Sequence, residues 1–221
     1  FGSFQQVVSY LFDPDGIFEA NLRRAGVRQL VVGSPRISGP EHAARQLARP
    51  LEQLALYLEN PAPSILPNEN HKTINGLIGL HPGSGSEKKN WPLDRFVRLA
   101  ASLLEETRNL RLLFVGGEAD AERMAHLSRS LPNERVERAE NLALPELARR
   151  LQGCAVFVGH DSGVSHLAAA VGVPCLLLFG PTDPAVWAPA NRDVRVLRAA
   201  DRTMAGIELS DVISALRELT S

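Results

Sequence analysis

From residue 76 onward, short apolar runs alternate with longer segments of helical periodicity, and no other feature of the sequence restricts the fold as much. The apolar runs are 77–80, 110–115, 154–158, 175–179 and 194–197, with a shorter one at Val136. The helical segments are 93–106, 119–130, 145–151 and 208–219. Repeated strand–helix units predict an α/β fold with a parallel sheet covered by helices on both faces. Such sheets bind their ligands at the carboxyl ends of the strands.

The residues before position 76 form a separate, smaller region. Residues 1–59 predict a strand over 7–12, a helix over 16–25, a strand over 29–32 and a longer helix over 41–58. Residues 60–75 are rich in Pro and Asn, which predicts a linker. The chain begins at Phe1 rather than Met and enters a strand-like run almost at once, so we expect further residues upstream.

Composition narrows the class of protein. The 24 Lys and Arg residues balance 25 Asp and Glu residues, so no basic excess indicates binding to nucleic acid. No apolar run approaches the about 20 residues of a membrane span. Cys154 and Cys175 lie in apolar runs, as expected for buried free thiols of a cytoplasmic protein. The sequence contains no clustered Asp/His ligand set, so we expect no metal site.

The polar segment 160–166, His-Asp-Ser-Gly-Val-Ser-His, follows an apolar run and precedes an Ala-rich helical segment. A helix that begins at this point presents free N–H groups and the positive end of its dipole, which favours phosphate. The alternatives are that Asp161 or Ser162 only caps the helix and that His166 is structural. A Ser/His/Asp catalytic triad is disfavoured, because these residues crowd one turn and no nucleophile elbow is present.

Three further loops follow predicted strands. The loop 81–92 offers Ser84, Gly85 and Lys89 to an anion, or it is a flexible surface loop with two solvated lysines. After Gly116-Gly117, an acidic side chain either binds the hydroxyls of a ribose or stabilises the positive end of a helix dipole. The segment 179–184 is a ligand contact or a proline-fixed turn.

Together and in this order, the motifs 81–84 with 89–92, 160–166 and 179–184 resemble glycosyltransferase family nine, the family of the ADP-heptose:lipopolysaccharide heptosyltransferases. The resemblance implies a GT-B fold. Residues 76–221 would be its Rossmann-like, nucleotide-sugar-binding C-terminal domain, and residues 1–59 part of its acceptor-side N-terminal domain.

The resemblance also implies roles for single residues. Ser84 and Lys89 would hold the diphosphate, with Lys89 stabilising the leaving group, and Leu142 would lie against the adenine. Glu118 would bind the ribose, with Asp120 as the alternative. The other expected donor-site residues are Gly85, Asp161, Ser162, Gly163, Val164 and His166. No position matches the family's catalytic base, and Asp13 and Asp15 belong to a later strand end, so we expect the base upstream.

The implied activity is inverting transfer of a heptose from ADP-heptose to a lipopolysaccharide-core or related acceptor, without metal or other cofactor. A lipid-linked acceptor implies peripheral contact with the inner face of the cytoplasmic membrane. Two other hypotheses stay open: a nucleotide-sugar 2-epimerase-like isomerase, and a non-catalytic nucleotide-sugar-binding module.

Overall fold

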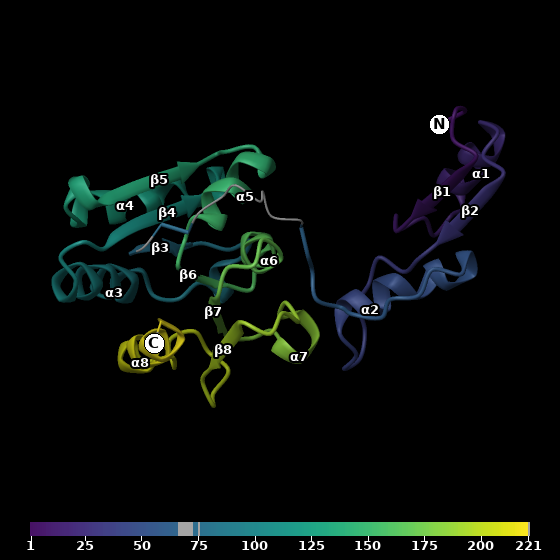
Figure 1. The fold of residues 1–221 in the computed structure, drawn as a ribbon. Coiled ribbons are helices and arrows are strands. Elements are labelled where there is room, and N and C mark those ends of the chain that lie inside the picture. The colour runs from purple at the N-terminus through teal and green to yellow at the C-terminus, as the bar shows by residue number, and fades with distance from the viewer. Residues whose placement is uncertain (66–72, 75, 221) are drawn as a thin grey trace. The chain divides into compact units, whose positions relative to one another are not determined.

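The computed structural model describes residues 1–65, 73–74 and 76–220. The chain divides into two compact units, Phe1–Pro61 and Ala62–Ser221, and each is described by itself (Figure 1).

The first unit is a small parallel strand–helix–strand arrangement followed by a helical segment. It contains β1 (Gln6–Ser9), α1 (Ile17–Arg24), β2 (Gln29–Val32) and α2 (Ala43–Ala48). The two strands pair in parallel, from Gln6 opposite Gln29 to Ser9 opposite Val32. The expected order of strand, helix and strand is therefore confirmed.

Two predictions in this unit are wrong in extent. The strand expected over 7–12 ends at Ser9. The single helix expected over 41–58 is divided, because α2 gives way to a 3-10 helix, Arg49–Leu54, that contains Pro50 at its start. Proline has no N–H to continue the α-helical ladder. The segment ends at Ala55, which has a left-handed conformation with φ 56°.

The second unit contains a six-stranded parallel sheet. Its strands are β3 (Leu77–Leu80), β4 (Arg111–Gly116), β5 (Val136–Glu140), β6 (Val156–His160), β7 (Cys175–Phe179) and β8 (Val194–Arg198). They are arranged in the order β5-β4-β3-β6-β7-β8. This is the doubly wound Rossmann order, in which the chain reverses direction across the sheet between β3 and β6. The helices that follow these two strands lie on opposite faces of the sheet, and the crevice at the carboxyl ends of the strands is the usual ligand site.

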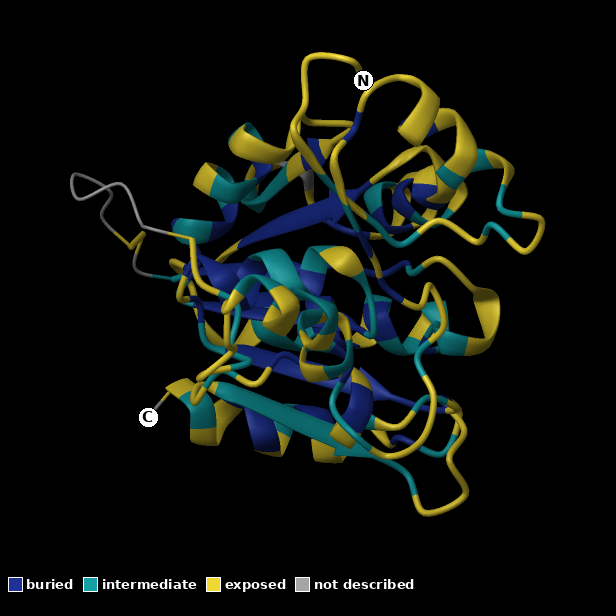
Figure 2. Cartoon of the chain, turned by 90° about the vertical axis from the view of Figure 1, so that its right-hand side faces the viewer, coloured by how far each residue is buried: buried dark blue, intermediate teal, exposed yellow. Residues whose placement is uncertain are grey.

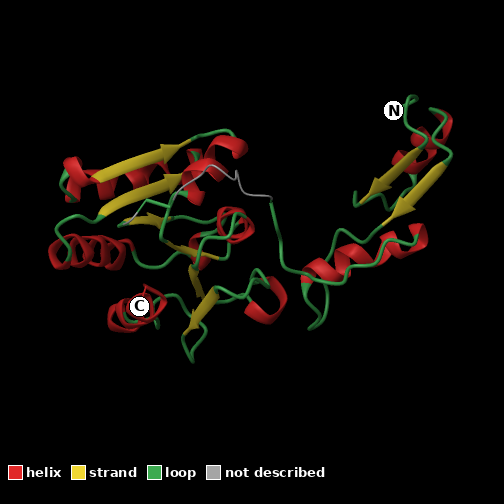
Figure 3. Ribbon diagram, in the orientation of Figure 1, coloured by secondary structure: helices red, strands yellow, loops and turns green. Residues whose placement is uncertain are grey.

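Helices cover both faces of this sheet (Figures 1 and 3). One face packs against α3 (Leu93–Glu106), α4 (Ala121–Ser130) and α8 (Leu209–Thr220). The other packs against α5 (Leu144–Gln152) and α6 (Gly163–Ala170), and the short α7 (Pro184–Trp187) follows β7.

Alternation along the strands divides the core between the two faces. In β7, Leu176 and Leu178 point to the α3 side, whereas Cys175, Leu177 and Phe179 point to the α6 side. A period of two is the geometry of a strand, and burial on both faces explains the continuous apolar runs. Figure 2 shows these central strands as buried, with the edge strand β8 at intermediate exposure.

Two differences from the expected elements affect the site. The strand expected over 154–158 lies two residues later, at Val156–His160, so its last residue is a buried histidine rather than a loop residue. The segment after residue 179, expected as a loop, contains the one-turn helix α7. The helix over 93–106 and the strands over 77–80 and 175–179 are confirmed.

Candidate nucleotide-sugar site

The loops after β3 and β6 meet at the carboxyl edge of the sheet, where the strand order reverses. A pocket of about 370 Å³ opens there, within the usual range of small-molecule sites. Its lining residues are Lys89, Asp161, Ser162, Gly163, His166, Thr182 and Trp187. Five of these seven are residues that the sequence analysis assigned to the site, and they come from loops far apart in the sequence.

An ion pair joins the two loops inside this pocket. Lys89 Nζ lies 3.2 Å from Asp161 Oδ2, across 72 residues of sequence. Both side chains are partly buried, with 25% and 11% of their surfaces exposed. Partial burial weakens solvent screening of the pair, so Lys89 is held at the pocket rather than extended into water.

The amino terminus of α6 forms one wall of the pocket. Ser162 is the N-cap, and its hydroxyl accepts a hydrogen bond from the Ser165 N–H at 3.4 Å. The capping alternative is therefore correct for Ser162 and wrong for Asp161, which pairs with Lys89 instead. Helical geometry leaves the N–H groups of Gly163 and Val164 without a partner within the helix, and Gly163 adds no side chain in front of them.

His160, the last residue of β6, fastens the loop 81–92 to the sheet. Its Nε2 accepts the Trp91 N–H at 3.0 Å, and its Nδ1 donates to the Gly83 carbonyl at 3.0 Å. Acceptance at one nitrogen and donation at the other require the neutral imidazole. Complete burial lowers the pKa of His160 to about 3, so this geometry persists at neutral pH.

Arg123, on α4, holds the same loop from the opposite side. Its Nε donates to the Pro82 carbonyl and its terminal nitrogen to the Trp91 carbonyl, both at 2.8 Å. Within the loop, Ser84 Oγ lies 2.7 Å from Asn90 Oδ1. These contacts anchor both ends of the loop and brace its middle, which disfavours the alternative of a flexible surface loop with two solvated lysines.

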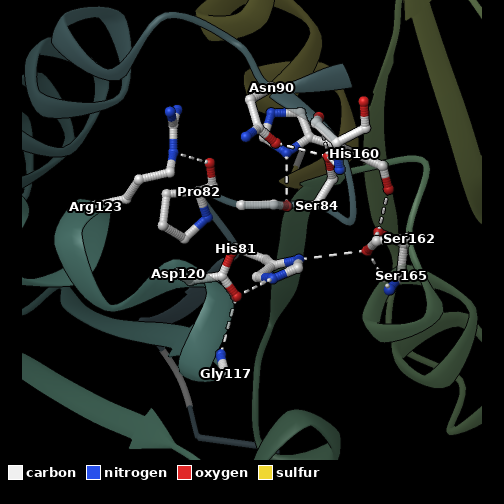
Figure 4. Close-up of polar contacts among 12 residues, drawn as sticks. His81, Pro82, Ser84, Asn90, Gly117, Asp120, Arg123, His160, Ser162 and Ser165 are labelled. Carbon is white, nitrogen blue, oxygen red and sulfur yellow. Dashed lines mark hydrogen bonds and ion pairs between the residues drawn. The ribbon is translucent and has the colours of Figure 1, made fainter. Parts of the chain in front are cut away.

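A buried polar chain links the loops after β3, β4 and β6. Asp120 Oδ2 accepts from the Gly117 N–H at 2.9 Å and lies 3.4 Å from His81 Nε2, and His81 Nδ1 lies 3.3 Å from Ser162 Oγ (Figure 4). Burial alone would raise the pKa of Asp120, but the hydrogen bonds from His81 and Gly117 outweigh it and lower that pKa.

An ionised Asp120 can only accept, so His81 donates to it from Nε2, while Nδ1 of His81 faces the Ser162 hydroxyl. The chain thereby orients Ser162. It also fixes the identity of residue 83, since a Cβ on Gly83 would lie 1.6 Å from Asp120 Oδ1.

Five expected donor-site residues lie outside the pocket lining. One of them is Ser84, whose hydroxyl donates to Asn90 Oδ1 within the loop 81–92. Gly85 and Glu118 are exposed, with Glu118 at the start of a short 3-10 turn after β4. Leu142, after β5, is 37% exposed, and the Val164 side chain packs against the α6-side core, which leaves its backbone N–H for the site. Since Asp120 is occupied by His81 and Gly117, Glu118 is the exposed acid of this loop.

Two pocket residues, Thr182 and Trp187, are not among those predicted from the sequence. Thr182 lies in the segment 179–184, for which the sequence allows either a ligand contact or a turn. Trp187 ends α7, a helix too short to have a periodic signal. Arg198, on β8, fixes this segment by donating to the Gly180 carbonyl at 3.2 Å.

Asp13, which lies at a strand end and is not expected to be the base, hydrogen-bonds to the first turn of α1. Its carboxylate accepts the N–H groups of Phe18 at 3.0 Å and Glu19 at 2.9 Å. Hydrogen bonds from Glu19 and Phe18 lower the pKa of Asp13, which makes it a poorer proton acceptor.

In the part of the chain that the structure describes, no helix has both the length and the apolar content to cross a membrane. Nor do the described residues place three or more His, Cys, Asp or Glu side chains together as metal ligands.

Comparison with known proteins agrees with the geometry. Residues 52–213 match Glycosyltransferase family 9 (heptosyltransferase). Lipopolysaccharide heptosyltransferase 1 of Pseudomonas aeruginosa is 39% identical over 108 residues, which cover 49% of this chain and 29% of that protein. Lipopolysaccharide heptosyltransferase 2 of Salmonella typhimurium is 28% identical over 166 residues, covering 72% and 47% of the two chains. The match therefore spans less than half the length of either curated relative.

A solved structure shows the same fold. Escherichia coli ADP-heptose LPS heptosyltransferase II superposes with a TM-score of 0.77 at 19% identity, over 97% of this chain and 75% of that one. The predicted GT-B architecture is thus confirmed, and the family match extends over most of the chain. The chain belongs to glycosyltransferase family 9, the heptosyltransferase family.

Proposed function

We propose that the protein is an inverting glycosyltransferase that transfers a heptose from ADP-heptose to a lipopolysaccharide-core or related glycan acceptor. One observation carries the proposal. The Lys89–Asp161 pair and the amino terminus of α6 share one pocket at the point where a Rossmann-order sheet reverses. A cation beside a helix amino terminus suits a diphosphate, and the chain belongs to a heptosyltransferase family, so both observations support the proposal.

In the proposed reaction, the acceptor hydroxyl oxygen attacks the anomeric carbon from the face opposite the diphosphate. The bond between that carbon and the phosphate oxygen breaks, and ADP leaves with the electron pair. A carboxylate base takes the hydroxyl proton. Attack from the opposite face inverts the anomeric configuration.

Lys89 and the N–H groups of Gly163 and Val164 would stabilise the negative charge that develops on the departing diphosphate. An ammonium group has three donors, so Lys89 can keep its contact with Asp161 and bind a phosphate oxygen at the same time. In this proposal these fixed groups supply the positive potential without a divalent metal or another cofactor. Because the acceptor is lipid-linked, the reaction takes place at the inner face of the cytoplasmic membrane.

A turnover assay tests the proposal. The full-length protein is incubated with ADP-heptose and a heptose-free lipopolysaccharide core, and ADP release and the anomeric configuration of the product are followed. Acceptor-dependent ADP release with inversion supports the proposal. Conversion of ADP-heptose to an isomer without acceptor would show an epimerase-like isomerase instead. Binding of ADP-heptose without transfer would show a nucleotide-sugar-binding module.

A further inference from the structure

The loops of the second unit follow a spatial order that assigns a part of the ligand to each. Along the carboxyl edge, the sheet order places the loop after β5 first, then those after β4, β3, β6 and β7. These loops carry, in the same order, Leu142, Glu118, Lys89, the segment 161–166 and Thr182. If the first two hold the nucleoside and the next two the diphosphate, the transferred sugar extends toward the loop after β7. This step rests on the proposed function.

Thr182 has an unused hydrogen-bonding group in that position. Its Oγ1 is buried and has no hydrogen-bond partner among the described residues, and the residue is one of those that line the pocket. Buried polar groups in folded proteins are almost always paired, so such an atom in a pocket wall points to a ligand group.

The loop that carries Thr182 is rigid enough to present it. Asp183 caps α7 by accepting the Ala185 N–H at 3.1 Å and also lies 3.6 Å from Arg198. Pro181 and Pro184 restrict the backbone on both sides of Thr182. The backbone at Thr182 is therefore held in place before a ligand arrives.

Trp187 adds an aromatic surface to the same end of the pocket. It is 38% exposed, whereas Trp91, the other tryptophan of the chain, is completely buried in the core. A partly exposed indole offers a rigid apolar face beside a polar edge. A sugar ring, with apolar C–H faces and hydroxyl edges, is the complementary shape.

We propose that Thr182 and Trp187 form the subsite for the transferred sugar, with the Thr182 hydroxyl bonded to a sugar hydroxyl and Trp187 covering one face of the ring. These two residues then set the preference for the sugar, whereas Lys89 and α6 set the affinity for the diphosphate.

Calorimetric titration of the chain with ADP and with ADP-2-deoxy-2-fluoro heptose separates these contributions. We expect Thr182→Val and Trp187→Ala to leave the affinity for ADP unchanged. Each should lower the affinity for the sugar analogue by about tenfold, equivalent to about 1.4 kcal/mol. Trp187→Phe keeps a ring face and should restore most of the lost affinity. Thr107→Val, at an exposed threonine outside the pocket, is the matched control.

Thermal unfolding of the free proteins checks that the variants fold. Thr182→Val is close in volume and removes an unpaired buried hydroxyl, so it should unfold at or slightly above the wild-type temperature.

Two results would overturn the inference. If both variants keep the wild-type preference for the sugar analogue over ADP, the residues do not contact the sugar. If both variants lose affinity for ADP and for the analogue equally, the two residues contact the nucleotide rather than the sugar. Failure of the wild-type chain to bind either ligand would instead contradict the proposed function itself.

Discussion

Two adjacent lysines show how strongly position decides the role of a residue. Lys88 is exposed, whereas Lys89 turns into the pocket and pairs with Asp161. Their sequence context is nearly identical, and the difference arises from the 3-10 turn Glu87–Lys89. Composition alone gives two basic side chains in the loop. The choice of Lys89 rests on the family resemblance, and the structure places this lysine in the pocket lining.

Lys89→Ala should weaken ADP binding by about 1.5–3 kcal/mol, the scale of a hydrogen bond to a charged group. Lys88→Ala should leave the affinity unchanged. Calorimetric titration with ADP measures both. Equal affinities of wild type and Lys89→Ala would remove Lys89 from the diphosphate site.

His160 makes folding depend on pH. Its pKa falls from 6.5 to about 3 in the folded state, so within this window the unfolded chain binds more protons at this residue. The free energy of unfolding should therefore rise with pH through the window and level off above 6.5, with a slope from this residue of at most about 1.4 kcal/mol per pH unit.

His160→Gln retains an acceptor for the Trp91 N–H but cannot titrate. Denaturant unfolding in the upper half of that window, where carboxyl groups stay ionised, should show a shallower slope for this variant than for wild type. His126→Gln, at an exposed histidine of α4, should keep the wild-type slope. Identical slopes for wild type and His160→Gln would mean that His160 is not held neutral by the fold.

At the scale of elements, the loop 81–92 behaves as part of the scaffold. Arg123 bridges its two ends from α4, and His160 bridges Gly83 and Trp91 from β6. The Trp91 indole also donates to the Ile207 carbonyl at 2.9 Å. The loop therefore presents Lys89 from a fixed frame, which lowers the conformational entropy that ligand binding must overcome.

Arg123→Ala should release both ends of this loop. We expect a loss of about 1.5–3 kcal/mol in the free energy of unfolding and weaker ADP binding, although Arg123 is not among the residues that line the pocket. Arg123→Lys should recover only part of the stability and ADP affinity, because an ammonium lacks the forked guanidinium that reaches two carbonyls. Arg129→Ala, on an exposed face of α4, is the control. If it changes the free energy of unfolding or the affinity for ADP as much as Arg123→Ala does, Arg123 does not hold the loop.

The elements were predictable where one physical cause dominates. Strands buried on both faces have continuous apolar runs, and α3 has a single apolar face, so their positions follow from the sequence. Pro50 shows where this reasoning fails, since the periodicity of 41–58 continues through a residue that interrupts the α-helical ladder. Helix α7 is too short to have any period.

The pairing of distant side chains was not predictable from pattern. Motif spacing identified the loops that carry Lys89 and Asp161, and strand order brings those loops together. The contact of His81 with Asp120 depends on a glycine at residue 83 that leaves space for the carboxylate, a matter of packing that no local signal reports. The unpaired hydroxyl of Thr182 likewise becomes visible only when the pocket is formed.

At the scale of the molecule, the second unit combines a rigid Rossmann-order sheet with loops that meet where its strand order reverses. The fold supplies the helix terminus and the crevice, and the sequence supplies the cation, the acid and the aromatic side chain that distinguish this site from others on the same fold. The central claim is that this pocket binds an ADP-sugar.

A thermal-shift panel of ADP-heptose, UDP-sugars and GDP-sugars against the chain tests that claim most directly. A ligand present at about 100 times its dissociation constant stabilises the folded state by about 2.7 kcal/mol. We predict such stabilisation by ADP-heptose and little by the UDP- and GDP-sugars. Stabilisation by a UDP-sugar alone, or by none of the ligands, would contradict the account.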